Sequence, residues 1–599
     1  MSTRPRTIQE LVHWLEIGGG ARWVRRAAVL VGTLVLSLLV AWKQFHGPVS
    51  ERTLAQADLG RQLARGEGFT TLVNYPQTAA FLRERGERFD PARPFPDLYH
   101  APLYPLVIAG ALRLWPEGAR AVLFANPPQP PDGFAADYFL LGLNLALLWL
   151  AAWLTFALAR RLFGAPAGWL AALGLLLSVA AWQQTVAVNG TPLLMVLGLL
   201  VFHAWLRIEE SAEAGETPGR RVAWLAALGT GCGGLFLADY PAGALVVVAL
   251  GYAGWRFAGR ARGAALAVIT LGFLLVVGPW LARNILVSGL PVGLAGQEFA
   301  LKAGDTTADP AVFRATLSAA VPELSLNKLG NKVLSTLQET VKSRLWSGGG
   351  FWFSAFFTVG WLYGFKAPPA NRLRWVFTAA LGVLLLAQAT FDSGEGERLV
   401  MTWCAPLIIV FGAGFFFVLL GSNAALAAWP RAAALGLLLL QGLPLVHDAL
   451  EPRRIHFQYP PYFPALFLSM KQELARRGAL DRYGVMADVP AGVAWYGQVR
   501  VWSQPPKLRD FYSITLEQPI GELLLTPRTL DRPFFTELNA RPVLPGMLGA
   551  VPNRFGEWGE IYAGLLTGRL PAEFPLGAPQ KLAENLYVLL NPALPPLRR

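Results

Sequence analysis

One carboxylate stands out in the stretch SERTLAQADLGRQLARGEGFTTL, residues 50–72, which follows the first long apolar run of the chain. It belongs to Asp58, early in a segment whose apolar spacing predicts an amphipathic helix. An acid in the first turns of a helix commonly only favours the helix dipole. A carboxylate beside a cavity can instead act as a general base that takes a proton from an attacking group.

Two polar aromatic side chains lie in YHAPLYPLVIAGAL, residues 99–112, where two prolines bracket a Leu-Tyr pair. His100 and Tyr104 fit two roles. As interfacial anchors, they would hold the chain at the boundary between membrane and water. As a cavity wall, they would stand beside the carboxylate of Asp58.

A third segment, VVGPWLARNILVSGLPVG, residues 276–293, carries Arg283 and Asn284 just beyond an apolar run. An arginine there can extend toward water or interact with the end of its helix. It can also bind an anionic headgroup, because a guanidinium group matches phosphate oxygens in a bidentate geometry.

Two more sites carry acidic residues between apolar runs. The stretch FDSGEGERLVMTWCAPL, residues 391–407, contains Glu397 and Arg398. The stretch FLADYPAG contains Asp239. Asp239 fits an ordinary turn, where aspartate is common.

The composition identifies a membrane protein with several spans. Of the 599 residues, 54% are hydrophobic and 15% are charged, and the mean hydropathy is +0.39. The net charge of +13 comes from arginines in short segments between apolar runs. That distribution follows the positive-inside rule, and it argues against a nucleic-acid partner. The arginine-rich segments lie at 22–26, 159–161, 219–221, 256–263 and 366–374.

Apolar runs of about 20 residues predict transmembrane helices. About eleven are expected, near 27–43, 137–158, 167–186, 191–207, 222–239, 241–257, 263–282, 350–366, 374–391, 399–420 and 431–447. A cytoplasmic N-terminus puts every arginine-rich short loop inside. The helices contain almost no ionisable residues, so we expect the chemistry at their outer ends.

This topology predicts three parts. They are a cytoplasmic segment 1–26, a transmembrane domain 27–449 with long external loops 44–136 and 283–349, and an extracytoplasmic domain 450–599. The last part alternates strand-like pieces such as YGVMADV with helical ones such as PALFLSMKQELARRGA, so we expect a small α/β domain. The fold class is therefore mostly α, with an α/β domain at the C-terminus.

The order of several short motifs resembles GT-C-type membrane glycosyltransferases. After the early Asp58 come GEGF at 66–69, then the patterns H-x-P-L-Y-P-L and P-W-L-x-R-N-x-x-x-x-G-x-P, and a late E-R-L followed by proline. The C-terminal stretch VMADVPAGVAWYGQVRVWSQP, residues 485–505, is similar to the soluble domain of many bacterial members. The bacterial branch related to protein O-mannosyltransferases and the lipid A aminoarabinose transferase is the most similar one.

The resemblance implies sugar transfer with inversion from a polyprenyl-phosphate donor to a lipid, glycan or protein acceptor. The reaction would occur on the outer face of a bacterial cytoplasmic membrane. Asp58 would be the general base, and it would also be the candidate ligand if a divalent cation, Mg²⁺ or Mn²⁺, takes part. The donor phosphate would be bound by Arg283, Asn284 and Arg398. The cavity would be lined by His100, Tyr104, Glu397 and Asp239.

Two positions depart from the family pattern. Many relatives have a second acid directly after the first, where this chain has Leu59. Relatives often carry a lysine or arginine where this chain has Asp239, so either one phosphate contact is missing or this acid binds something different, such as a cation or an amine of the acceptor. Two other functions therefore stay open beside the enzyme. One is a transporter or flippase of lipid-linked or anionic substrates, and the other is a non-catalytic scaffold protein.

Overall fold

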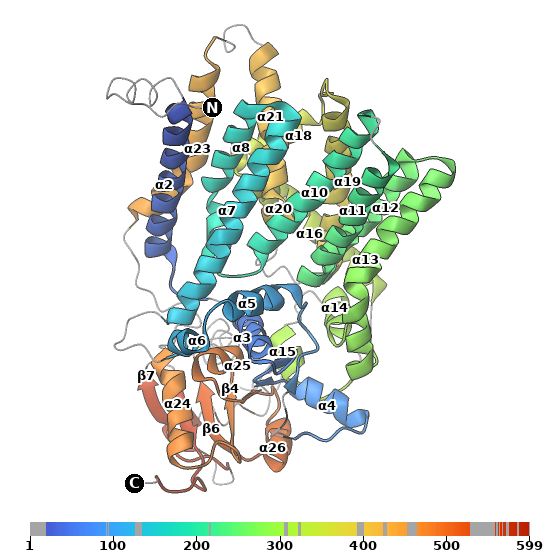
Figure 1. The fold of residues 1–599 in the computed structure, drawn as a ribbon. Coiled ribbons are helices and arrows are strands. Elements are labelled where there is room, and N and C mark those ends of the chain that lie inside the picture. The colour runs from blue at the N-terminus through green and yellow to red at the C-terminus, as the bar shows by residue number, and fades with distance from the viewer. Residues whose placement is uncertain are drawn as a thin grey trace, which may run out of the picture.

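The chain was analysed as a computed structural model, in which a bundle of long helices meets a smaller part built around a β-sheet (Figure 1). The residues that the structure describes are 19–48, 50–90, 93, 95–125, 134–214, 217–304, 310–320, 325–391, 400–422, 428–451, 464–526, 558, 561, 564–565, 567–570, 574–583 and 586–597.

Eight helices among the described residues are long and apolar enough to cross a membrane. They are α2 (Gly19–Gln44), α7 (Ala135–Phe163), α10 (Thr191–Glu213), α11 (Pro218–Ala238), α13 (Gly259–Ser288), α19 (Pro368–Phe391), α21 (Ala405–Ser422) and α23 (Pro430–Leu450). A ninth span is the pair α8 (Ala165–Leu176) and α9 (Val179–Val186), bent by 51°. Large apolar side chains such as Leu30 and Leu275 are exposed on these helices, as expected where lipid covers them. The predicted multi-pass, mostly helical fold is confirmed.

Two of the eleven expected spans are shorter than predicted. The run 241–257 forms a 3₁₀ turn, η1 (Tyr240–Ala244), followed by α12 (Leu245–Arg256), and the run 350–366 forms α18 (Phe351–Gly360). A helix of 12 residues is about 18 Å long, against about 30 Å for the apolar core of a bilayer.

The segments between the spans supply the remaining helices of this part. They are α3 (Glu51–Arg65), α4 (Pro76–Glu84), α5 (Leu103–Arg113), α6 (Glu117–Leu123), α14 (Ala295–Gly304), α15 (Pro310–Ala315), α16 (Leu326–Glu339), the π-turn η2 (Thr340–Arg344), α17 (Leu345–Gly348) and α20 (Val400–Trp403). Helices α3, α5 and α15 lie between the bundle and the sheet, and α4 lies to one side of the sheet part (Figure 1).

Helix α3 has clear start and stop signals. The Ser50 hydroxyl accepts a hydrogen bond from the backbone N–H of Thr53 (3.1 Å), which caps the first turn. Gly66 ends the helix with φ +87°, a left-handed conformation that glycine adopts without strain. Between these ends, ten consecutive residues from Thr53 to Gln62 are buried. The helix is therefore central rather than an amphipathic surface helix, because other elements cover it on all sides.

The sheet combines distant parts of the chain. Its strand order is β2-β5-β4-β6-β8-β7, from β2 (Val73–Asn74), β4 (Gly484–Ala487), β5 (Val501–Ser503), β6 (Ile520–Leu525), β7 (Gln580–Ala583) and β8 (Leu586–Leu590). The first four strands in this order run parallel, and β8 and β7 pair antiparallel. Strand β2 comes from the loop after the first span, so the sheet crosses the predicted domain boundary at residue 450.

The C-terminal part also contains α24 (Pro464–Arg476), α25 (Pro490–Gly492), the π-turn η4 (Val493–Gly497) and α26 (Leu508–Glu517). A small ribbon of β1 (Thr70–Thr71) and β3 (Phe95–Pro96) lies in the first loop. The parallel strands and their helices agree with the α/β architecture expected for this region.

A buried carboxylate joins the sheet part to the bundle. Asp137, in the first turn of α7, accepts hydrogen bonds from Trp495 Nε1 (2.9 Å) and Tyr496 Oη (2.8 Å). All three side chains are buried. Buried polar groups that lose their partners are costly, so these two bonds fix how η4 packs on α7.

We predict that Asp137→Ala loosens this junction. Both donors would lose their acceptor, at a cost of about 1–3 kcal/mol for each buried group left unpaired. Thermal unfolding of the purified protein in detergent should show a lower Tm, and limited proteolysis should cut between the two parts more readily. The matched control is Asp481→Ala, an exposed aspartate of the sheet part. An unchanged Tm for Asp137→Ala would contradict this account of the junction.

Candidate functional site

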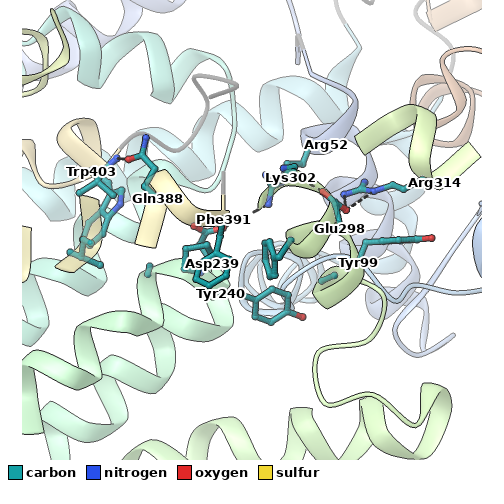
Figure 2. A pocket seen from close by; sticks show the side chains of 16 residues that line it. Arg52, Tyr99, Asp239, Tyr240, Glu298, Lys302, Arg314, Gln388, Phe391 and Trp403 are labelled. Atoms are coloured by element: carbon teal, nitrogen blue, oxygen red, sulfur yellow. Dashed lines mark hydrogen bonds and ion pairs between the residues drawn. The ribbon is translucent and has the colours of Figure 1, made fainter. Parts of the chain in front are cut away.

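A cavity with about 670 Å³ of empty space, part of it open to the surroundings, lies where the loop helices meet the bundle. Its charged lining residues are Arg52, Asp239, Glu298, Lys302 and Arg314 (Figure 2). The wall formed by the ends of α19 and α20 and by η1 is largely apolar and aromatic, with Tyr240, Leu384, Phe391, Val400 and Trp403. One side of the cavity is therefore polar and the other is largely apolar.

Glu298 is the centre of the polar wall. It accepts hydrogen bonds from Arg314 Nε (3.0 Å) and Nη2 (2.8 Å), and its other oxygen lies 3.5 Å from Lys302 Nζ. Burial alone would raise the pKa of Glu298, but the two cations outweigh it and hold the pKa at about 2. The carboxylate therefore stays ionised, and it fixes both cations on the cavity wall.

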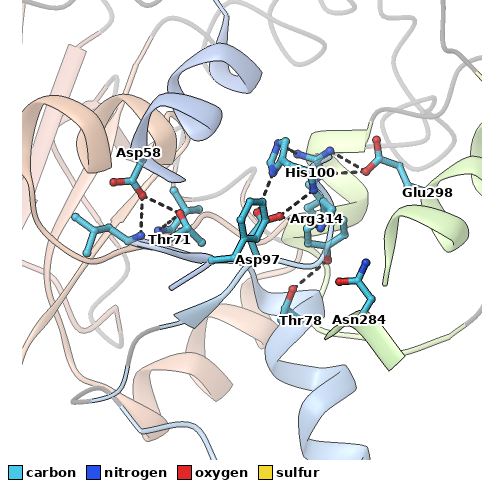
Figure 3. Close-up of polar contacts among 12 residues, drawn as sticks. Asp58, Thr71, Thr78, Asp97, His100, Asn284, Glu298 and Arg314 are labelled. Atoms are coloured by element: carbon cyan, nitrogen blue, oxygen red, sulfur yellow. Dashed lines mark hydrogen bonds and ion pairs between the residues drawn. The ribbon is translucent and has the colours of Figure 1, made fainter. Parts of the chain in front are cut away.

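Arg314 also contacts a second group of residues, beside those of the cavity wall. His100 Nε2 lies 3.3 Å from Arg314 Nη1, and His100 Nδ1 lies 2.8 Å from Asp97 Oδ2 (Figure 3). The guanidinium also lies over the ring of Tyr99, 4.8 Å from its centroid, in a cation–π geometry. Because Arg314 is a donor and Asp97 an acceptor, the neutral His100 carries its proton on Nδ1.

Burial and neighbouring charges together determine the protonation states of His100 and Asp97. Burial lowers the pKa of His100, although Asp97 opposes that effect. Burial also acts to raise the pKa of Asp97, but His100 and Arg314 outweigh it and hold the pKa at about 2. At neutral pH the group thus consists of one carboxylate, one neutral imidazole and one guanidinium.

The second ion pair of the cavity bridges two elements. Arg52 Nη2, on the first turn of α3, lies 3.7 Å from Asp239 Oδ1, at the C-terminal end of α11. Their side chains are 33% and 14% exposed. This pair is longer and more open to solvent than the contacts that Glu298 makes with Arg314.

The structure places Asp58 away from this cavity (Figure 3). Its carboxylate is 0% exposed and accepts hydrogen bonds from Arg61 Nη2 (2.5 Å), Thr71 Oγ1 (2.9 Å) and Leu72 N (2.8 Å). These contacts tie α3 to the strands after it. The sequence suggested a solitary acid, whereas the folded chain pairs it with Arg61 one helical turn later.

Three other predicted site residues make mainly structural contacts and do not line the cavity. The Tyr104 hydroxyl donates to the Val188 carbonyl (2.7 Å). Arg283 donates to the backbone carbonyls of Asp97 (3.0 Å) and Phe69 (3.1 Å), so it fastens the first loop to α13. The third residue, Asn284, accepts a hydrogen bond from Arg283 Nη1 (2.8 Å). Their predicted functional roles stay predictions.

Asp239 thus lines the cavity, and His100 contacts the lining residue Arg314. Glu397 and Arg398 lie outside the described residues. The sequence analysis missed Arg52, Glu298, Lys302 and Arg314. Arg314 and Lys302 belong to the long loop 283–349, whose helical stretches had no spacing that pointed to a site. Arg52 lies only six residues before Asp58, but on a helix the two side chains lie on different faces.

A resident divalent cation does not fit this group of residues. Among the described residues, no cluster of three or more His, Cys, Asp or Glu side chains could hold a metal ion. The two carboxylates of the cavity each face a cation instead. Asp58 faces Arg61 and two other donors, so Mg²⁺ or Mn²⁺ would have to displace them.

Comparison with known proteins identifies the fold. The apo oligosaccharyltransferase of Archaeoglobus fulgidus is similar with a TM-score of 0.51 and 9% identity, over 84% of this chain and 70% of that one. ArnT from Cupriavidus metallidurans in the apo state has a TM-score of 0.49 and 12% identity, over 95% of this chain and 99% of that one. The same protein bound to undecaprenyl phosphate gives a TM-score of 0.49 and 12% identity, over 96% and 99%.

No family model matches the sequence, and no curated protein matches it either. The similarity to the oligosaccharyltransferase shows that the chain has the fold of a GT-C membrane glycosyltransferase. The fold expected from the order of the motifs is thereby confirmed.

We predict that His100 makes the folded protein less stable in mild acid. Its pKa is lowered in the folded state, so below about pH 6.5, the usual value, the unfolded chain binds a proton that the folded chain resists. Stability should therefore fall as the pH drops from 7.5 to 5.5. In His100→Gln this fall in Tm should be smaller, as measured by thermal unfolding in detergent.

The control for this prediction is His447→Gln, because the His447 side chain is 74% exposed. It should keep the pH dependence of the unmodified protein. A His100→Gln variant whose Tm still falls as steeply would show that other groups cause the effect.

Proposed function

We propose that the protein is a membrane glycosyltransferase that moves a sugar from a polyprenyl-phosphate donor to an acceptor hydroxyl or amine, with inversion at the anomeric carbon. The reaction would occur on the outer face of a bacterial cytoplasmic membrane, with the sheet part outside. The observation that carries the proposal is the cavity between the ends of the spans and the loop helices, with one apolar wall and one cationic wall.

The two walls suit the two ends of a lipid-linked donor. The aromatic and aliphatic side chains at the ends of α19 and α20 would contact the first isoprene units as the lipid enters from the bilayer. The polar wall carries three cations and two carboxylates, namely Arg52, Lys302 and Arg314 against Asp239 and Glu298. This excess of positive charge favours an anionic group such as the phosphate of the donor.

In this reaction the cations would stabilise the leaving phosphate. The acceptor atom would form a bond to the anomeric carbon on the face opposite the phosphate, while the bond from that carbon to the phosphate oxygen breaks. The electron pair leaves with the polyprenyl phosphate, whose new negative charge Arg52, Lys302 and Arg314 would stabilise. The proton of the acceptor goes to a carboxylate, and no general acid is needed for such a leaving group.

Among the carboxylates, the geometry favours Asp239 as the general base over the predicted Asp58. Asp239 lines the cavity, whereas Asp58 is fully buried and bound to three donors. Glu298 is less suitable, because its cationic partners hold its pKa at about 2 and a base is most effective when its pKa lies near the working pH.

Paired substitutions test this assignment. We expect Asp239→Asn to lower sugar transfer by about 10²- to 10⁴-fold, the usual contribution of a general base, while Tm stays near that of the unmodified protein. Asp58→Asn should lower Tm instead, because it weakens a buried pair, and its residual activity should follow the folded fraction. The assay would use protein in nanodiscs with radiolabelled undecaprenyl-phosphate hexose and pentose donors, and envelope extract as acceptor.

The possible results distinguish between Asp239 and Asp58 as the base, and between an enzyme and a flippase. Full activity in Asp239→Asn would remove Asp239 from the reaction. Loss of activity in Asp58→Asn at unchanged Tm would support Asp58 as the base. Failure of the unmodified protein to transfer any labelled sugar, with intact donor moved to the opposite leaflet when the protein is placed in sealed vesicles, would favour a flippase.

A further inference from the structure

A neutral amide lies on the largely apolar wall of the cavity. Gln388 belongs to α19, three residues before the C-terminal end of that helix, and it lines the cavity although it is only 5% exposed. The nearby lining residues on this wall carry no charge, and they are Leu384, Phe391, Val400 and Trp403. A polar group in such surroundings needs partners, because an unpaired buried donor or acceptor is costly.

One hydrogen bond fixes the orientation of this amide. The backbone N–H of Val400, the first residue of α20, donates to Gln388 Oε1 (2.8 Å). A backbone N–H can only donate, so the amide atom that faces it must be the oxygen. The first N–H groups of a helix have no partner within the helix, and here the side chain of Gln388 supplies the acceptor. The nitrogen of the amide therefore points away from Val400.

This nitrogen, Nε2, carries two N–H donors that no described residue accepts, since Gln388 bonds only to Val400 within that part of the chain. Gln441, another buried glutamine in a span, differs because its Nε2 donates to the Gly349 carbonyl (3.1 Å). Gln56 differs as well, because its unpaired Nε2 is enclosed by the protein, whereas Gln388 lines a cavity. A ligand in the cavity would thus meet two free donors beside Gln388.

The chemistry of a donor lipid indicates which of its parts fits these N–H groups. Isoprene units have no atom that accepts a hydrogen bond. The phosphate is attracted by cations, and Glu298 and Arg314 lie at the opposite end of the cavity from Gln388 and Trp403 (Figure 2). The sugar is bonded directly to the phosphate, and its hydroxyl oxygens can accept hydrogen bonds without carrying charge. The sugar is therefore the part that suits a neutral donor at this end.

Two aromatic rings beside Gln388 also suit a sugar. Phe391 and Trp403 line the same wall, and pockets for small ligands commonly combine such rings with a few polar groups that fix orientation. The ring of Trp403 is closely packed, because a side-chain carbon at Gly198 would lie only 3.1 Å from its Cζ3 atom. Leu384 lies four residues before Gln388, about 6 Å further into the span, and remains available to the isoprene units.

We propose that Gln388 determines sugar specificity, because its Nε2 group donates a hydrogen bond to a hydroxyl oxygen of the sugar on the donor lipid. The end of the cavity at Gln388, Phe391 and Trp403 is then the sugar subsite, while the cations hold the phosphate. This inference rests on the proposed function and adds the chemical class of the transferred group, a sugar with a hydroxyl at this place. A site that hydrogen-bonds a hydroxyl discriminates against the analogue that lacks it.

The test compares two lipids on the same protein. Native mass spectrometry would give the Kd of undecaprenyl phosphate and that of its glucose or mannose derivative, whichever binds more tightly. We expect Gln388→Met to weaken the sugar lipid about three- to tenfold, which corresponds to one neutral hydrogen bond. The Kd of undecaprenyl phosphate should change by less than about twofold. The ratio of the two Kd values does not depend on the folded fraction.

Deoxy analogues of the sugar lipid identify the hydroxyl. One analogue should bind the unmodified protein about three- to tenfold more weakly than the parent lipid. It should bind Gln388→Met as well as the parent does, because the two changes remove the same contact. Gln388→Glu is the second variant if Gln388→Met does not fold, since its carboxylate still accepts from Val400. An analogue with fluorine in place of this hydroxyl, which cannot donate, should bind Gln388→Glu more weakly than it binds the unmodified protein.

Gln441→Met is the matched control, because Gln441 is a glutamine with the same 5% exposure in a span but does not line the cavity. It should leave the ratio of the two Kd values unchanged. Equal weakening of both lipids by Gln388→Met would place the amide at the phosphate and overturn the inference. A ratio that stays the same in Gln388→Met would overturn it as well.

The proposed function can fail separately. A Kd ratio that depends on Gln388, without sugar transfer by the unmodified protein, would support the sugar subsite and reject the glycosyltransferase. Transfer together with a ratio that is independent of Gln388 would keep the enzyme and reject the subsite. An unmodified protein that binds neither undecaprenyl phosphate nor its sugar derivatives would overturn both.

Discussion

The buried ion pair between Asp58 and Arg61 determines where α3 lies, and the cavity depends on α3. Burying two charges is favourable only when hydrogen bonds replace most of the lost water. Here Asp58 accepts from three donors in addition to a weaker contact, and Arg61 donates to the carbonyls of Trp495 (2.8 Å) and Ala494 (2.7 Å). The pair therefore joins the first loop to the C-terminal part at one point.

Helical geometry separates this structural pair from the cavity. Residues on an α-helix follow one another by about 100°, so Arg52 and Asp58, six positions apart, point in directions about 120° apart. If the first turn of α3 presents Arg52 to the cavity, Asp58 must face another side. The sheet part covers that side through η4, so one helix can connect the two parts and still supply a cation to the site.

The sequence allowed the architecture to be predicted because its signals are physical and local. Long apolar runs with arginines between them specify spans, and every expected span is a helix or a pair of helices in the structure. The site was less predictable. Asp239 was a candidate because relatives often carry a lysine or arginine at that position, but Arg52, Glu298 and Arg314 are ordinary residues of amphipathic segments until the fold brings them together.

The misleading signal was the apparent isolation of Asp58. Its partner Arg61 lies three positions later, a spacing at which two side chains share one face of a helix, so the sequence did contain evidence for a pair. Nothing local indicated that this face would be covered by residues more than 400 positions away. Burial changes the meaning of such a pair, from a weak contact in water to a fixed structural element.

The charges of the cavity are divided unevenly between cations and carboxylates, and this division has a physical reason. A site that binds an anion needs cations that do not move away when the cavity is empty, yet complete neutralisation by carboxylates would remove the attraction. Glu298 holds two cations but supplies only one negative charge, so one positive charge stays uncompensated at a fixed place. Arg52 lies 3.7 Å from Asp239, so the cavity as a whole has three cations and two carboxylates, and its net charge stays positive. That net charge acts at a distance, whereas the contacts of Glu298 keep two of the cations in place.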